Sequence, residues 1–398
     1  MIEQRIHGNE MEYLEEVLGT DFRASAGASM MKRFEQAFAS RFGSKHGIAF
    51  VNGTATMHAA LEAWGIGEGD EVIVPPLTMA STTFAVLQCN ATPVFADIDP
   101  DTFQISADAI AKQITNKTKA IITVAVFGLS PDMDPIMQLA KDYGLKVLED
   151  NAECFLGEYK GKIAGTIGDC ASFSLQNSKH LTSGEGGIVI TDDDEFADRL
   201  RKIVSLGYAG VSAKSGKVSR KDIQDPNYLR HQILGWNYRM PELCCAVALA
   251  QVENIDALVD RRKAVGKLFE EVVASSSDWF RSQVTPADHV HSYWTFVAQL
   301  MRDDVTWHAL RDRFQMLGGD GVYACWKLTY QEPFMINRDF LNRSRYISEE
   351  RLAEYGAGLC PVAELVQPRL FQFKTNYWDF SRAEAQAEIL HKTLASFV

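Results

Sequence analysis

Short apolar runs alternate with helical patterns over the first two-thirds of the chain. Several of these runs are rich in Val and Ile on both faces, which is typical of strands buried on both sides of a sheet. The alternation predicts an α/β fold with a doubly wound, mostly parallel sheet. The expected strands are 46–51, 70–75, 92–98, 119–128, 145–150, 170–175 and 186–191, with helices at about 55–64, 106–114 and 133–143.

The pattern changes after residue 205. Residues 208–227 are polar, basic and contain Gly and Ser, so we expect a long exposed loop. A long helix is expected over 241–268, with Pro241 in its first turn. The last third predicts a smaller α+β unit, and we therefore divide the chain into a large domain, 1–255, and a small domain, 256–398. The elements expected in that unit are strands at 291–301 and 321–326, a helix at 306–317, and a closing helix with a Ser381/Glu384 capping box.

Composition narrows the class of protein. The 398 residues carry a formal net charge of −12, which disfavours a nucleic-acid or anionic-membrane partner. No apolar run approaches the ~20 residues of a membrane span, and the charged N-terminus lacks a signal-peptide core. The seven cysteines show no Cys-x-x-Cys spacing, so buried free thiols and no metal site are expected. We expect a cytoplasmic protein.

Lys179 and Asp150 are the candidate catalytic residues. Asp150 ends an apolar strand, and Lys179 lies about thirty residues later, between a short apolar run and a Gly-rich turn. Pyridoxal phosphate (PLP) chemistry needs both residue types, because the amine forms a Schiff base and a buried carboxylate keeps the pyridine nitrogen protonated. Taken alone, a lysine is usually a solvated charge and an aspartate at a strand end is often a helix cap.

Other polar residues near these strands fit a cofactor site less specifically. After the first strand, Gly53 and Thr54 begin a helix whose N-terminus suits a phosphate, although a simple capped helix explains the segment equally well. Glu153 lies three residues after Asp150 and is a candidate contact of the ring hydroxyl or the substrate. Hydroxyl residues at 78, 81 and 82 have helix capping as their commoner role. The hydroxyls of Ser172, Ser174 and Ser178 are candidate phosphate ligands.

The order of several motifs resembles the DegT/StrS-type sugar aminotransferases, which are PLP enzymes of the aspartate aminotransferase fold (fold type I). The motifs are NGT (52–54), VPPLT (74–78), TPVFADIDPDTF (92–103), EDNA (149–152), SFSLQNSKHLTSGEGG (172–187) and NYRMPE (237–242). The resemblance covers about residues 20–260.

This resemblance implies a role for each candidate residue. Lys179 is expected to bind PLP and move protons, Asp150 to pair with the pyridine nitrogen, and Glu153 to lie near the ring oxygen. Met79 stands where the family usually has an aromatic residue against the ring. Thr54, Ala55 and Ser174 are expected to hold the phosphate, together with Asn237 of the partner subunit in a homodimer with shared active sites.

The resemblance also bears on the substrate. It implies that a sugar carbonyl is aminated with L-glutamate as donor and with pyridoxamine phosphate as the intermediate cofactor form. Many nucleotide-sugar members carry a Tyr-Pro-x-Pro-Leu-His-like stretch, whereas this chain reads GVYACWKLTYQEP (321–333). Our specific hypothesis is therefore amination of 8-oxo-3,8-dideoxy-octulosonate to 8-amino-Kdo for lipopolysaccharide.

Three alternatives stay open. One is a nucleotide-linked 3- or 4-ketohexose or a keto-cyclitol as the substrate of the same reaction. Another is a PLP-dependent sugar dehydratase, which is disfavoured because those enzymes replace the lysine with histidine, whereas here His180 follows Lys179. The third is a PLP-binding regulator, for which no DNA-binding segment is visible.

Overall fold

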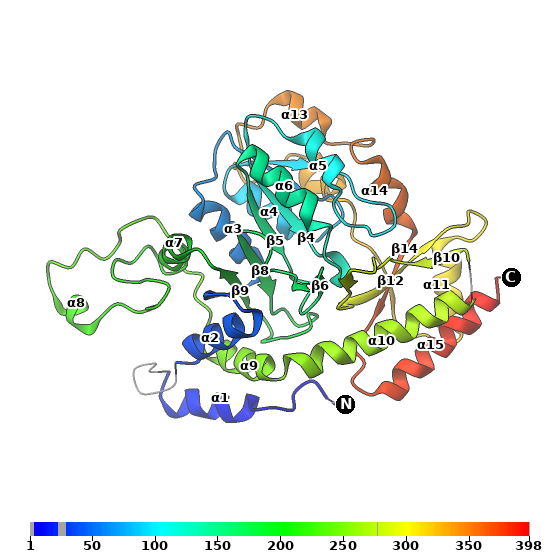
Figure 1. Ribbon diagram of the computed structural model, residues 1–398, viewed down its shortest axis with the longest axis horizontal. Coiled ribbons are helices and arrows are strands. Elements are labelled where there is room, and N and C mark those ends of the chain that lie inside the picture. The colour runs from blue at the N-terminus through cyan, green and yellow to red at the C-terminus, as the bar shows by residue number, and fades with distance from the viewer. Residues whose placement is uncertain (1–3, 23–28, 277, 398) are drawn as a thin grey trace.

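The computed structural model describes residues 4–22, 29–276 and 278–397 (Figure 1). A seven-stranded sheet lies at its centre, in the order β1-β9-β8-β5-β4-β2-β3. All its neighbours pair in parallel except β9, which is antiparallel to both β1 and β8. The strands are β1 (His46–Phe50), β2 (Glu71–Val74), β3 (Thr92–Phe95), β4 (Thr118–Val124), β5 (Lys146–Asp150), β8 (Cys170–Ser174) and β9 (Gly187–Thr191).

All seven predicted strands are present, and the expected mostly parallel sheet is confirmed. The run predicted over 119–128 is only partly a strand, because β4 ends at Val124 and a 3₁₀ turn, η2 (Val126–Gly128), follows it. Alternating side chains enter cores on opposite faces: Val72 and Val74 on one side, Ile73 on the other. Helices cover both faces, which explains why the runs are apolar throughout.

The helices of the large sheet fall into two layers (Figure 1). Those packing in the core that contains Val72 and Val74 are α3 (Gly53–Ala63), α4 (Ser81–Gln88) and α7 (Asp194–Val204). Those packing in the cores on the other face are α1 (Glu10–Gly19), α2 (Met30–Phe42), α5 (Ala107–Gln113), α6 (Met133–Tyr143) and α9 (Glu242–Glu253).

A smaller antiparallel sheet, ordered β10-β12-β14-β13, forms the second lobe. Its core holds residues of three helices, α10 (Ile255–Ser276), α11 (Trp307–Met316) and α15 (Phe380–Ala395). Its strands are β10 (Phe280–Ser282), β12 (Thr295–Leu300), β13 (Val322–Ala324) and β14 (Leu370–Lys374). A third sheet is formed by β11 (His289–Val290), β6 (Glu158–Tyr159) and β7 (Lys162–Ile163).

Three details of the predicted helices are wrong. The helix expected over 241–268 is two helices, because α9 ends before Asn254 and α10 starts at Ile255. Pro241 precedes the first turn in extended conformation, with φ −63° and ψ 145°. The cap of α15 is Asp379, whose Oδ1 accepts from the Ser381 N–H at 3.0 Å, so Ser381 lies inside the helix and does not begin a capping box.

The chain after the small lobe's third strand returns to the large sheet. The Thr329 N–H donates to the Pro76 carbonyl at 3.0 Å, and Leu328, Tyr330 and Val366 join the large-sheet core. The boundary after residue 255 falls just inside the start of α10, and the division into domains 1–255 and 256–398 stays a prediction. The elements of this returning segment are η3 (Thr329–Gln331), α12 (Pro333–Ile336), α13 (Glu349–Glu354), α14 (Pro361–Val366) and η4 (Gln367–Arg369).

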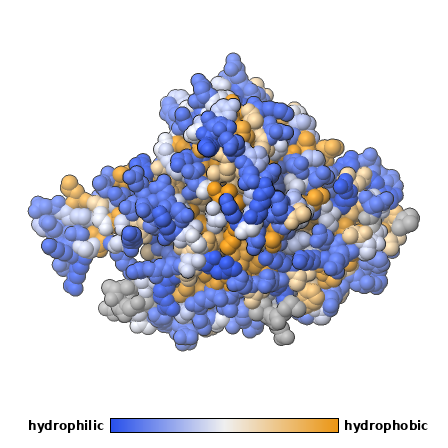
Figure 2. Space-filling model, in the orientation of Figure 1, coloured by the Kyte–Doolittle hydropathy of each residue, from blue (hydrophilic) through white to orange (hydrophobic). Residues whose placement is uncertain are grey.

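The predicted loop at 208–227 projects from the body, at the left of Figure 1. It is irregular except for α8 (Arg220–Gln224) and short turns. Ile223, Leu229 and Leu234 are exposed in and just after it, and Figure 2 shows hydrophobic atoms on this projection. We call residues 208–235 the projecting loop. No helix in the described part of the chain is both long and apolar enough to cross a membrane.

Candidate active site

A cavity of about 360 Å³ opens at the C-terminal ends of the central strands β5 and β8. Ligands in open α/β sheets bind outside the carboxyl ends of the strands, and the predicted residues gather there. The lining includes Asn52, Gly53, Thr54, Thr78, Met79, Ser81, Asp150, Glu153, Ser174, Gln176, Ser178, Lys179, Glu185, Trp294 and Trp326.

Lys179 lies on the turn between β8 and β9. The turn is closed by backbone hydrogen bonds, including Leu175 N–H to the Gly186 carbonyl at 2.9 Å. The Lys179 amine is 3.2 Å from Glu153 Oε1 and 4.1 Å from the centroid of the Trp294 indole ring. Its side chain is only 12% exposed, so this lysine is unlike an ordinary solvated one.

Asp150 is buried where β5 ends. Its Oδ2 accepts from the Thr82 hydroxyl at 3.0 Å, and its Oδ1 accepts from the Ala152 N–H at 3.2 Å. Burial raises the pKa of Asp150, and these two hydrogen bonds together with the charge of Lys179 oppose the rise. Thr82 therefore supports Asp150 and does not cap a helix.

Glu153 is also buried, and its two oxygens have different partners. Oε1 meets the Lys179 amine, and Oε2 accepts from the Phe127 N–H at 3.0 Å. Phe127 has φ 65°, an uncommon conformation for a bulky residue, and it sits in the 3₁₀ turn that follows β4. Burial raises the pKa of Glu153, whereas the Lys179 charge lowers it.

These charges fit the cofactor that the sequence predicts. Two buried carboxyl groups, Asp150 and Glu153, face one ammonium group, that of Lys179. A protonated pyridine nitrogen beside Asp150 would supply the second positive charge and offset the cost of ionising that carboxyl in a buried place. In this fit Lys179 would provide the amine for the aldehyde, and Asp150 the carboxylate beside the protonated ring nitrogen.

The N-terminus of α3 forms the other end of the cavity. Asn52 caps this helix and accepts the Ala55 N–H at 2.8 Å, while the N–H groups of Gly53 and Thr54 have no partner among the described residues. A side chain at Gly53 would bring its Cβ within 3.0 Å of the Ser174 Cβ. This close approach places free N–H groups beside the Ser174 hydroxyl, as a phosphate requires. Ala55 does not line the cavity, and its N–H is already occupied.

Aromatic rings form a wall that was not predicted from the sequence. Trp294 and Trp326 stack with centroids 5.8 Å apart, and Phe127 also stacks with Trp326, with centroids 5.9 Å apart. Trp294 also donates its indole N–H to the Ser178 carbonyl at 3.0 Å. Met79, in contrast, is 52% exposed at the cavity rim.

Asn237, like Ala55, is not among the residues that line this cavity. It is exposed and forms an isolated β-bridge with Ser205. The aromatic residues beside it are anchored, because the Trp236 indole donates to Glu62 at 2.6 Å and the Tyr238 carbonyl accepts the Val51 N–H at 2.9 Å. Its contact with a partner's phosphate stays a prediction.

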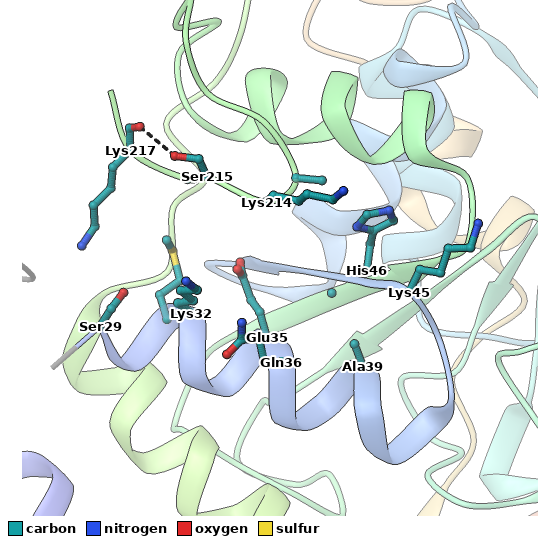
Figure 3. Close-up of a pocket in the computed structure, with 14 residues that line it drawn as sticks. Ser29, Lys32, Glu35, Gln36, Ala39, Lys45, His46, Lys214, Ser215 and Lys217 are labelled. Carbon is teal, nitrogen blue, oxygen red and sulfur yellow. Dashed lines mark hydrogen bonds between the residues drawn. The ribbon is translucent and has the colours of Figure 1, made fainter. Parts of the chain in front are cut away.

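A second, larger cavity of about 530 Å³ lies between α2 and the projecting loop (Figure 3). Lys32, Lys45, Lys214 and Lys217 line it, and all four are exposed. Figure 3 shows Lys45 and Lys217 at opposite ends of the view. The buried carboxylate there, Glu35, already pairs with Arg201 at 2.6 Å. This cavity has no buried amine and therefore does not fit PLP.

The sequence profile of the DegT/DnrJ/EryC1/StrS aminotransferase family matches residues 4–348. The chain belongs to this family. It is a PLP-dependent sugar aminotransferase with the type I fold, and PLP is its cofactor.

Individual relatives of this aminotransferase carry more specific names. The chain is 38% identical over 297 residues to the GDP-perosamine synthase of Caulobacter vibrioides. This alignment covers 74% of this chain and 76% of that protein. It is 38% identical over 287 residues to the GDP-perosamine synthase of Escherichia coli O157:H7, covering 72% and 74%.

Solved structures agree in fold. An aminotransferase from Psychrobacter cryohalolentis superposes with a TM-score of 0.83 at 25% identity, covering 97% of this chain and 96% of that one. The 3-amino-5-hydroxybenzoic acid synthase gives the same TM-score and coverage at 26% identity. The aminotransferase thus has the predicted fold over nearly its whole length.

Proposed function

We propose that this aminotransferase moves the amino group of L-glutamate to the keto carbon of a nucleotide-linked 3- or 4-ketohexose. The observation that carries the reaction is the buried Lys179 amine, 3.2 Å from Glu153 and in one cavity with Asp150. When bound there, PLP withdraws electrons from the carbon whose proton is transferred.

The chain's residues have distinct roles in this proposal. Lys179 holds the cofactor and moves the proton, and Glu153 accepts a hydrogen bond from its ammonium group when the lysine is free. Asp150 keeps the ring nitrogen protonated, and Thr82 and Ala152 fix the carboxylate. Trp294 lies beneath the lysine amine and closes the cavity wall against water.

The phosphate is held at the start of α3. The free N–H groups of Gly53 and Thr54 and the Ser174 hydroxyl bind it, and the helix dipole favours its negative charge. Ala55 contributes by donating its N–H to the Asn52 side-chain oxygen, while the N–H groups of Gly53 and Thr54 stay free for the phosphate. Met79, at the rim of the cavity, would contact the ring of the bound cofactor.

The choice of a nucleotide-linked sugar rests on likeness to proteins named GDP-perosamine synthases over about three quarters of both chains. This likeness supports the nucleotide-sugar alternative better than amination of the octulosonate for lipopolysaccharide. The projecting loop adds exposed cations, Arg220, Lys221 and Arg230, that suit a pyrophosphate as well as a carboxylate. A GDP-linked sugar is therefore the first substrate to test.

The active unit in this proposal is a homodimer. Asn237 is exposed between two anchored aromatic residues, where a second copy can reach it. The projecting loop exposes Ile223, Leu229 and Leu234, which are apolar side chains that a partner would cover. Each cavity then receives Asn237 from the other subunit.

A substrate panel tests the proposal. The purified protein is incubated with L-glutamate and, separately, with GDP-, UDP- and dTDP-linked ketohexoses and with 8-oxo-3,8-dideoxy-octulosonate, and the amino sugar is identified by mass spectrometry. We expect 2-oxoglutarate to form with a nucleotide-linked sugar and not in the Lys179→Ala variant. Turnover of the octulosonate alone would reverse the substrate choice, and product from the Lys179→Ala variant would remove the proposed mechanism.

A further inference from the structure

Two arginines from outside the sheet bind the backbone of the turn that carries Lys179. Arg262, in α10, donates from Nη2 to the carbonyls of Ser178 and Lys179, each at 2.8 Å. Arg5, near the N-terminus, donates from Nη2 to the same Lys179 carbonyl at 2.5 Å, and from Nη1 to the Asn177 carbonyl at 2.5 Å. One carbonyl oxygen is thus shared by two guanidinium groups.

The other side of the Arg262 guanidinium binds the small lobe. Its Nη1 donates to the Trp294 carbonyl at 2.7 Å and lies 3.5 Å from the Thr375 hydroxyl. The Trp294 indole in turn donates to Ser178, and its ring lies beneath the Lys179 amine. Arg262 therefore fixes both the main chain of Lys179 and the ring that its amine contacts.

The environment of Arg262 is costly for a cation. The side chain is buried, and the ion pairs of the described residues do not include it. Burial lowers the pKa of Arg262 to about 9, and the positive charge of Arg5 contributes. A buried cation without a counter-ion takes up a large part of a protein's net stability. Arg201, which is equally buried, instead pairs with Glu35 in the usual way.

We propose that Arg262 is a positioning residue for the Lys179 amine, with Arg5 supporting the same carbonyl. Its planar fork holds the turn at 177–180 against Trp294, so that the amine stays over the ring and within reach of Glu153. Because α10 and Trp294 belong to the small lobe, this guanidinium also fastens that lobe to the catalytic turn. The inference rests on the proposed role of Lys179, and it adds a residue that touches neither cofactor nor substrate.

The test compares Arg262→Gln, Arg262→Lys and Arg5→Gln with Arg201→Gln, which removes a buried guanidinium remote from the turn. In cofactor-free protein, acetic anhydride labelling of Lys179 is measured by mass spectrometry against the exposed Lys45 as internal reference. We expect labelling of Lys179 to rise about tenfold in Arg262→Gln, because the turn opens locally. Arg262→Lys should rise less, since a lysine keeps the charge without the fork.

The loaded enzyme gives two further readouts. In Arg262→Gln, kcat should fall about 10²-fold with KM for glutamate nearly unchanged, because a displaced reacting group lowers the rate without weakening donor binding. The pH midpoint at which the visible absorption of the bound cofactor changes should also shift. Arg201→Gln should lower the melting temperature and leave the labelling, the kcat and the absorption as in the wild type.

Wild-type labelling, kcat and absorption in a folded Arg262→Gln protein would overturn the proposal and leave Arg262 a purely structural residue. If this variant does not fold, the decision passes to Arg262→Lys and Arg5→Gln, where unchanged labelling in both would overturn it equally. Failure of the proposed function is recognised separately, because borohydride reduction of the wild-type protein would then trap the cofactor on a lysine other than Lys179.

Discussion

The two cavities described above both combine lysine with buried carboxylate, yet they differ in how the buried charges are balanced. Around Lys179, two buried carboxyl groups face one shielded amine. Between α2 and the projecting loop, the buried Glu35 is matched by Arg201, and the four lysines are exposed to water. The buried charges are therefore balanced in the larger cavity and unbalanced around Lys179. Unmatched buried charge identifies the site for chemistry better than volume does.

The largest difference should appear when a single lysine in each of the two cavities is replaced by alanine. Lys179→Ala should lower turnover by ~10⁴-fold or more, as when other covalent catalytic residues are removed, and should end borohydride trapping of PLP. Lys45→Ala, in the larger cavity, should retain both properties. Peptide mapping and steady-state rates measure them. If borohydride trapped PLP on a different lysine of the wild-type protein, the assignment of Lys179 would be wrong.

The buried carboxyl groups give the next largest difference. Asp150→Asn should reduce kcat by ~10²-fold or more, because an amide cannot stabilise the positive charge on the ring nitrogen. Glu35→Gln should lower the denaturation midpoint, since it leaves Arg201 buried and unpaired, with kcat unchanged. Normal turnover in a folded Asp150→Asn protein would contradict the assignment of Asp150.

Acid should destabilise the region around Lys179 through His180. Burial, with help from the Arg262 charge, holds the pKa of His180 well below its ordinary 6.5, and its Nε2–H donates to the Ser292 carbonyl at 2.9 Å. The unfolded chain therefore binds a proton below pH 6.5 that the folded chain does not. The free energy of unfolding should fall by ~1.4 kcal/mol per pH unit from this residue as pH drops.

Denaturant unfolding at a series of pH values between 7 and 5 measures this effect. In His180→Gln the free energy of unfolding should fall less steeply between pH 7 and 5, because Gln keeps the donor to Ser292 without titrating. A decrease as steep in His180→Gln as in the wild type would show that His180 does not carry the acid sensitivity.

The smallest effect concerns the dimer. Lys179→Ala and Asn237→Asp should each be inactive, the latter because a carboxylate repels the cofactor phosphate. Mixed subunits should recover at most about a quarter of wild-type activity, since about half of the dimers are mixed and each holds one intact site. If Asn237→Asp binds PLP normally and mixing restores nothing, Asn237 makes no cross-subunit contact.

The sequence predicted the parts of the site that follow strand ends. Lys179, Asp150 and Glu153 were identified because each lies in or beside an apolar run that had to be a strand, and the ends of such strands meet at one edge of the sheet. The seven strands were found for the same reason. Their runs are apolar on both faces, and strands in a sheet that is covered on both sides bury both of these faces.

Other contacts depended on packing that no local pattern reveals. Trp294 and Trp326 come from the distant small lobe, and only the lobe's position brings them to the cavity. Arg262 lies in a helix with many charged residues, where an arginine predicts a solvated face. Asp379 and Ser381 are both good caps, and the choice depends on how α15 packs. The family resemblance identified the fold and reaction class, whereas the substrate hypothesis drawn from it received less support than its alternative.

The return of residues 328–366 to the large sheet has a consequence during synthesis. Every strand of that sheet has been translated once Thr191 leaves the ribosome, yet its core still lacks Leu328, Tyr330, Ile347, Ala363 and Val366. Nascent large sheet therefore exposes apolar surface while much of the remaining chain is made, which is a time when chaperones bind. A stop codon anywhere before Val366 removes core residues from a sheet whose strands are all complete.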